Sequence, residues 1–230
     1  MKKIGLIGGM SWESSLLYYQ IINQEVNKRL GGQHSAECIM YSVNFAEIEE
    51  LQSKNDWEHL TYHMARAARS LERAGANFVL ICTNTMHKVA PAVQTEIEIP
   101  LLHIADAVGD CIVNQQMKTV GLLGTKFTME EDFYKQRLSE KYNLDVMIPG
   151  RRDRQYVHDV IYKELCHGQI NDDSRKRFVE IIDQLYKSGV EGVILGCTEI
   201  PLLIKQVDVY PKIFDTVYIH AIKAVDIALS

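Results

Sequence analysis

Short apolar stretches rich in β-branched residues alternate along the chain with longer amphipathic stretches. The short stretches predict strands, and the longer ones predict helices. The predicted strands lie near Lys3–Ile7, Glu37–Val43, Phe78–Cys82, Leu101–His103, Thr119–Leu123, Asp145–Met147, Gly192–Leu195 and Ile213–Phe214. The predicted helices include Glu13–Leu30, Trp57–Ala74, Met129–Lys141, Arg154–Cys166, Arg175–Ser188 and Thr216–Leu229. This alternation builds parallel sheets covered by helices on both faces, so the predicted fold class is α/β.

Two blocks of sequence recur in the second half of the chain. Ile4–Gly8 reappears as Val120–Gly124 with an offset of 116 residues, and Leu71–Thr83 matches Leu185–Cys197 with an offset of 114. Apolar runs that end in glycine are common among α/β strands, so chance similarity is the alternative explanation. The shared order and spacing instead favour two similar lobes.

We therefore predict two pseudo-symmetric lobes, residues 1–102 plus 215–230 and residues 103–214, each a mainly parallel sheet flanked by helices. Ligands of open parallel sheets bind beyond the carboxyl ends of the strands, so the active site is expected in the cleft between the lobes. The candidate strand ends are Gly8–Ser11, Thr83–Thr85, Gly124–Lys126 and Cys197–Glu199.

Composition narrows the function classes. The 230 residues carry a formal net charge of −5, which argues against nucleic acid as a partner. No apolar stretch approaches the roughly 20 residues of a membrane span, so we expect a soluble, cytoplasmic protein with no membrane partner. The five cysteines are widely spread and form no Cys-x-x-Cys pair, which fits neither a disulfide framework nor a zinc site.

Cys197 stands where a strand passes into a predicted helix. Backbone N–H groups at a helix N-terminus favour a thiolate, so we expect a lowered pKa and a thiol that acts as base or nucleophile. An inert cysteine at the end of a core strand is the alternative. In the first lobe, Thr83-Asn84-Thr85 offers donors that can hold a small carboxylate, or simply a helix cap from Asn84 or Thr85.

Together these segments resemble the aspartate/glutamate racemase family, in particular its branch of aspartate and broad-specificity amino-acid racemases that use no pyridoxal phosphate. The resemblance covers essentially the whole chain. The matching positions are Ile4–Met10, Thr83–His87, Tyr162, Gly168, Gly196–Glu199 and Asp215.

The resemblance implies a cofactor-independent isomerase that removes the α-proton of an amino acid on one face and returns a proton on the other. Family members use two opposed cysteines, with donors that hold the α-carboxylate. Neither a cofactor nor a metal ion is expected, and analogy with such folds suggests a homodimer. The candidate substrate contacts are Met10, Ser11, Gln52, Asn84, Thr85, Thr198 and Glu199.

The chain departs from the family pattern at the first catalytic cysteine, which is Thr83 here. We therefore expect Cys197 to be the acidic thiol and Thr83 to fill the opposed position as a donor or relay. Cys82 is the alternative second base, although alternation along the strand turns its side chain away from the face of Thr83.

The segment Asn44–Gln52 contains no Lys or Arg, which favours a neutral, polar or varied substrate side chain over strict aspartate specificity, with Gln52 as a contact. Two other functions stay open. One is decarboxylation of a substituted malonate, which suits a single functional thiol. The other is a two-lobed small-molecule-binding protein without chemistry.

Overall fold

The computed structural model describes residues 1–230 as two compact units, residues 1–104 with 217–230 and residues 105–216. Each unit has one four-stranded parallel sheet, in the order β2-β1-β3-β4 in the first and β6-β5-β7-β8 in the second. The predicted α/β class is therefore confirmed. The strands are β1 (Ile4–Gly8), β2 (Cys38–Ser42), β3 (Phe78–Ile81), β4 (Leu101–Leu102), β5 (Thr119–Gly124), β6 (Asp145–Met147), β7 (Gly192–Gly196) and β8 (Lys212–Asp215).

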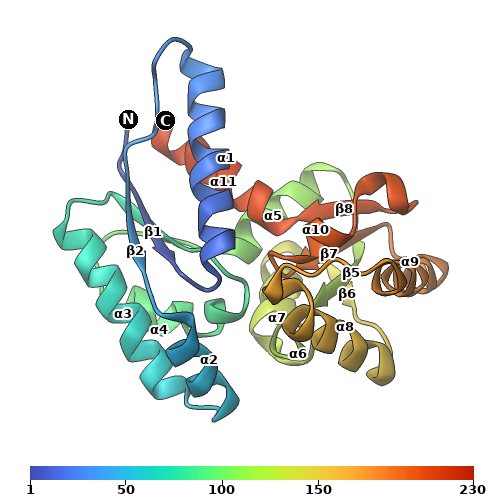
Figure 1. Cartoon of the computed structure of the whole chain (residues 1–230). Helices are drawn as coiled ribbons and strands as arrows, with labels where there is room; N and C mark the ends of the chain where they lie inside the picture. Colours follow the sequence, from blue (N-terminus) through green and yellow to red (C-terminus); the bar gives the residue numbers. More distant parts are fainter. The chain divides into compact units, whose positions relative to one another are not determined.

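Helices cover both faces of the first sheet (Figure 1). One face packs on α1 (Trp12–Leu30) and α11 (Thr216–Leu229), and the other on α2 (Phe45–Ser53), α3 (Trp57–Arg73) and α4 (Ala90–Gln94), which the 3₁₀ helix η1 (Thr85–Val89) precedes. Every residue of β1 and β3 is buried, because a parallel strand covered on both faces needs apolar side chains on both. This burial explains the continuous apolar runs in the sequence.

The second unit repeats the arrangement around β5 and β7, whose residues are buried apart from Thr119. The β5–β7 register pairs Val120 with Gly192, just as the β1–β3 register pairs Ile4 with Phe78. The repeated blocks of sequence thus form equivalent neighbouring strands. The helices of this unit are α5 (Ile104–Asn114), α6 (Lys126–Glu130), α7 (Asp132–Tyr142), α8 (Arg151–Lys163), η2 (Leu165–His167), α9 (Asp172–Lys187), α10 (Ile200–Leu203) and η3 (Gln206–Asp208).

The helix predictions differ from the structure mainly in short elements. The expected helix Met129–Lys141 is divided at Glu131, whose ψ of 157° is extended. No helix is predicted between the second strand and Trp57, but α2 forms there, and Asn44 caps it by accepting a hydrogen bond from the Ala46 N–H at 3.3 Å. Helices of one or two turns contain too few apolar positions to show a clear period in the sequence. None of the helices has both the length and the apolar character needed to cross a lipid bilayer.

Gly9, at the carboxyl end of β1, has no room for a side chain. Its φ is +92°, and a Cβ atom would lie 2.3 Å from the Val43 carbonyl oxygen. We expect Gly9→Ala to lower the free energy of unfolding by about 3 kcal/mol or more, because it adds backbone strain to a steric clash. Gly32→Ala is the control, since Gly32 also has positive φ (+57°) but nothing within 4 Å. Urea denaturation of both variants checks this, and equal losses would show that the clash relaxes at no cost.

Candidate active site

The predicted site residues of the first unit gather at one edge of its sheet. Met10 and Ser11 follow β1, and Thr83, Asn84 and Thr85 follow β3. Since β1 and β3 are parallel neighbours, their carboxyl ends lie side by side. Thr83 is half-buried, and the other four residues are buried. The edge is therefore lined with polar groups that little bulk water reaches.

Hydrogen bonds hold the turn after β1 in place. The Ser11 hydroxyl caps α1 by accepting from the Ser14 N–H at 3.3 Å, and the Ser15 hydroxyl donates to the Ser11 carbonyl at 3.0 Å. The Gly9 N–H donates to the Ser15 hydroxyl at 2.8 Å. Ser11 thus has a structural role as a helix cap beside its predicted role as a substrate contact.

After β3 the side chain of Asn84 does not cap the following helix. Asn84 occupies the N-cap position of η1, but its side chain makes no capping hydrogen bond. Gln52 reaches the same segment from α2, because its buried amide nitrogen lies 3.3 Å from the Met86 sulfur. The structure therefore brings Gln52 beside the turn that follows Thr83.

Cys82 is a core residue. Its side chain is fully buried in the apolar cluster on the face of β3 that packs against α1 and α11. Burial raises the pKa of the Cys82 thiol far above its ordinary value. These surroundings disfavour the alternative in which Cys82 is the second base, because the thiol is buried away from solvent and its anion is destabilised.

In the second unit, Cys197 directly follows β7 and is 7% exposed. Its thiol donates a hydrogen bond to Glu199 Oε2 at 3.0 Å, and the Thr198 hydroxyl donates to the same oxygen at 2.6 Å. Thr198 and Glu199 are also buried. The three consecutive residues thus form a compact group in which one carboxylate oxygen accepts from a thiol and a hydroxyl.

These neighbours oppose the expected ionisation of Cys197. Burial raises its pKa well above the ordinary value, and the Glu199 carboxylate, the nearby Cys166 and the thiol hydrogen bond raise it further. The Glu199 backbone hydrogen bond lowers it, but this is the smallest effect. The helix that follows, α10, has only four residues. The expected lowered pKa is therefore not found in the chain without a ligand: the surroundings of Cys197 raise the pKa of its thiol instead.

The raised pKa predicts slow alkylation of Cys197. At pH 7–8 a smaller fraction of Cys197 is thiolate than of an ordinary cysteine, because the pKa of the Cys197 thiol is higher. Glu199→Gln removes a negative charge beside the sulfur, so alkylation of Cys197 at pH 8 should become about tenfold faster. Iodoacetamide labelling followed by peptide mass spectrometry measures this, with the half-buried Cys111 as internal reference. An unchanged Cys197 rate would contradict the carboxylate's influence.

Sequence reasoning identified Glu199 only as a substrate contact and missed its bond to Cys197. The position of Glu199, two residues after the cysteine, could have indicated that their side chains lie close together. The proximity of Cys166 was also missed, since 31 residues separate it from Cys197 in the sequence. The turns containing Thr83 and Cys197 occupy equivalent places, because each follows the strand that pairs with the first strand of its own sheet.

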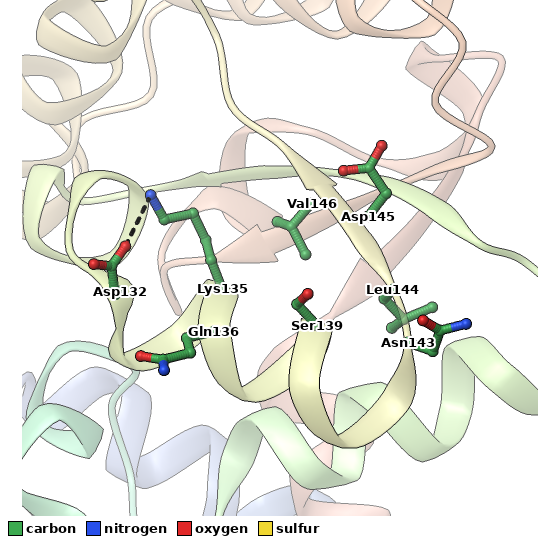
Figure 2. A pocket seen from close by; sticks show the side chains of 8 residues that line it. All are labelled: Asp132, Lys135, Gln136, Ser139, Asn143, Leu144, Asp145 and Val146. Carbon is green, nitrogen blue, oxygen red and sulfur yellow. Dashed lines mark ion pairs between the residues drawn. The ribbon is translucent and has the colours of Figure 1, made fainter.

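A surface hollow of about 610 Å³ lies elsewhere in the second unit, between α7 and β6 (Figure 2). Asp132 and Lys135 form an ion pair there, with 3.8 Å between Oδ1 and Nζ. None of the candidate site residues lines this hollow. It is lined by Asp132, Lys135, Gln136, Ser139, Asn143, Leu144, Asp145 and Val146.

Comparison with known proteins finds relatives and solved structures that are named as racemases. A candidate Asp/Glu racemase from Yersinia pestis is 50% identical, with a TM-score of 0.95 and full coverage of both chains. An aspartate racemase homologue from Pyrococcus horikoshii is 39% identical, with a TM-score of 0.85 and full coverage of both. A glutamate racemase from Actinobacillus pleuropneumoniae is 29% identical over 126 residues, 54% of this chain and 46% of that protein.

The match to this glutamate racemase and to a second glutamate racemase from the same species thus spans about half of their length. The family model for Asp/Glu/hydantoin racemases, by contrast, matches residues 7–224, which is nearly the whole chain. The match includes both strand ends at which Thr83 and Cys197 lie. The chain belongs to the Asp/Glu/hydantoin racemase family.

Proposed function

We propose that this protein is an amino-acid racemase or epimerase that works without pyridoxal phosphate. Family membership supports the reaction class, and the contact between Cys197 and Glu199 is the observation that carries the chemistry. A thiol that already donates to a carboxylate has an acceptor for its proton, so a thiolate can form when a substrate is in place.

The proposed reaction begins when Glu199 takes the Cys197 proton. The thiolate then removes the α-proton of the amino acid, which becomes a carbanion, and the thiol is restored. Buried donors such as the side chains of Asn84 and Thr85 would hold the α-carboxylate and stabilise the developing charge. Thr83 would deliver a solvent proton to the opposite face through its hydroxyl, which completes the inversion, and Glu199 would then release the proton it had taken to the solvent.

The substrate class follows from the charges near Gln52. The stretch Asn44–Gln52 carries three glutamates and no cation, so a second carboxylate on the substrate would find no partner there. We therefore propose a neutral or polar side chain. Because some relatives are named as aspartate or glutamate racemases, these two acidic amino acids should be tested as substrates beside the neutral ones.

Exchange of the α-proton in D₂O tests the proposed function. Each L-amino acid is incubated with the wild-type protein, proton NMR follows loss of the α-proton, and chiral chromatography follows inversion. Exchange together with inversion of at least one amino acid is the expected result. Binding of amino acids without exchange would instead identify a binding protein that lacks the chemistry.

A second candidate function, decarboxylation of a substituted malonate, is favoured by one feature. Cys197 is the one thiol at the two equivalent strand ends, since Thr83 stands at the other and Cys82 is a core residue. A single thiol can protonate an enolate from one face after loss of CO₂. Release of CO₂ from a malonate, with no inversion of any amino acid, would identify the protein as a decarboxylase.

A further inference from the structure

Three histidines lie together in the first unit, behind the turn that contains Thr83. His87 and His220 are fully buried, and His103 is nearly so. The ring of His87 lies 4.5 Å from that of His103 and 5.7 Å from that of His220, measured between centroids, and both contacts are edge-on. His87 is on η1, and His220 is on α11. Rings packed this closely leave His87 little freedom to rotate.

The two hydrogen bonds of the His87 ring specify its tautomer. The Ile104 N–H is a donor, so His87 Nε2, at 3.1 Å, must accept and carries no proton. The Thr83 carbonyl is an acceptor, so His87 Nδ1, at 2.8 Å, must donate. His87 is therefore neutral with its proton on Nδ1. An imidazolium would place a second donor against the Ile104 N–H and break that bond.

His220 anchors the other side of the cluster. Its Nε2 donates to the Leu102 carbonyl at 2.9 Å, and its Nδ1 accepts from the Tyr18 hydroxyl at 2.7 Å. Burial lowers the pKa of His220 to about 3, so this ring is also neutral. His220 thus holds Leu102, at the end of β4, two residues before the Ile104 that binds His87.

The ring of His87 therefore joins the turn after β3 to the segment after β4. A carbonyl held by a buried N–H sets the orientation of its peptide plane, and through it the direction of the neighbouring side chain. The carbonyl held here belongs to Thr83, the residue proposed to serve the second face of the substrate.

We propose that His87 is a positioning residue for Thr83: through its Nδ1–H bond to the Thr83 carbonyl, the neutral ring directs the Thr83 hydroxyl toward the substrate. This inference rests on the proposed racemase function. It assigns His87 no proton transfer, because both ring nitrogens are engaged with the backbone.

A matched pair of substitutions tests this role. In His87→Asn the side-chain amide can replace Nδ1 as donor to the Thr83 carbonyl, whereas in His87→Gln the longer amide can replace Nε2 as acceptor from the Ile104 N–H. Each variant keeps one of the two backbone bonds. Tyr18→Phe is the control, because it removes a hydroxyl from the same cluster without touching either bond of His87.

The readout is the rate of inversion divided by the rate of α-proton exchange in D₂O. Exchange on the face served by Cys197 does not need Thr83, whereas inversion does. We expect this ratio to fall about ten- to a hundredfold in His87→Gln and to stay within about threefold of wild type in His87→Asn and Tyr18→Phe. A loss of stability alone would lower both rates together and leave the ratio unchanged.

An unchanged ratio in His87→Gln, with active wild type, would overturn this role and leave the proposed function intact. Wild type that neither exchanges nor inverts any amino acid would overturn both. Nitrogen-15 NMR of the histidine rings is a second test that does not depend on any variant folding. A proton on Nδ1 and none on Nε2 of His87 is expected, and a proton on Nε2 would overturn the proposal.

Discussion

Cys197→Ser is expected to lower the rate of α-proton exchange by about 10³-fold or more for every substrate. A serine hydroxyl is far less acidic than a thiol, and this position is buried beside a carboxylate, which penalises any anion further. The loss corresponds to removal of a general acid–base group, which contributes about 10²- to 10⁴-fold. Proton NMR in D₂O, from both enantiomers, measures it.

Cys111→Ser is the matched control for this substitution. Cys111 is half-buried on α5 and has no place in the proposed chemistry, so its replacement should leave exchange within about twofold of wild type. Circular dichroism of both variants shows whether they fold. Intact exchange in a folded Cys197→Ser protein would show that another group removes the α-proton, and this would contradict the proposed mechanism.

Glu199→Gln is expected to separate the reactivity of Cys197 from catalysis. The amide can still accept hydrogen bonds from the thiol and from the Thr198 hydroxyl, but it is no base. Exchange should therefore fall about 10²-fold, because the thiol loses the group that takes its proton. At the same time, alkylation of Cys197 at pH 8 should become faster, since the pKa of the thiol falls when the carboxylate is removed.

The test distinguishes two roles of Glu199, because the rate of exchange and the rate of alkylation are expected to change in opposite directions. If exchange rises together with alkylation, Glu199 only restrains ionisation of the thiol and does not take its proton. Glu180→Gln is the control, because Glu180 lies on α9 in an exposed ion pair with Arg177. Its replacement should change neither rate by more than about twofold, as is usual for exposed pairs.

Sequence patterns predicted the strands better than the helices, for a physical reason. All eight predicted strands are present, and the four central ones, β1, β3, β5 and β7, are the buried parallel strands that form continuous apolar runs. Short helices such as α2 and α6 begin at the side-chain caps Asn44 and Thr125 instead, and their sequences are too short to show a clear apolar period. The repeat predicted two similar lobes, and its two blocks form the equivalent strand pairs β1 with β3 and β5 with β7.

The α/β class, the repeat and the two strand ends at which Thr83 and Cys197 lie could be predicted from the sequence, because these features follow from local order and spacing. The surroundings of each group depend on folding and could not. Folding buries the Cys82 thiol in the core, and it places the Glu199 carboxylate against Cys197, which reverses the expected direction of that pKa. It also fixes the tautomer of His87, because that depends on backbone groups brought together by folding.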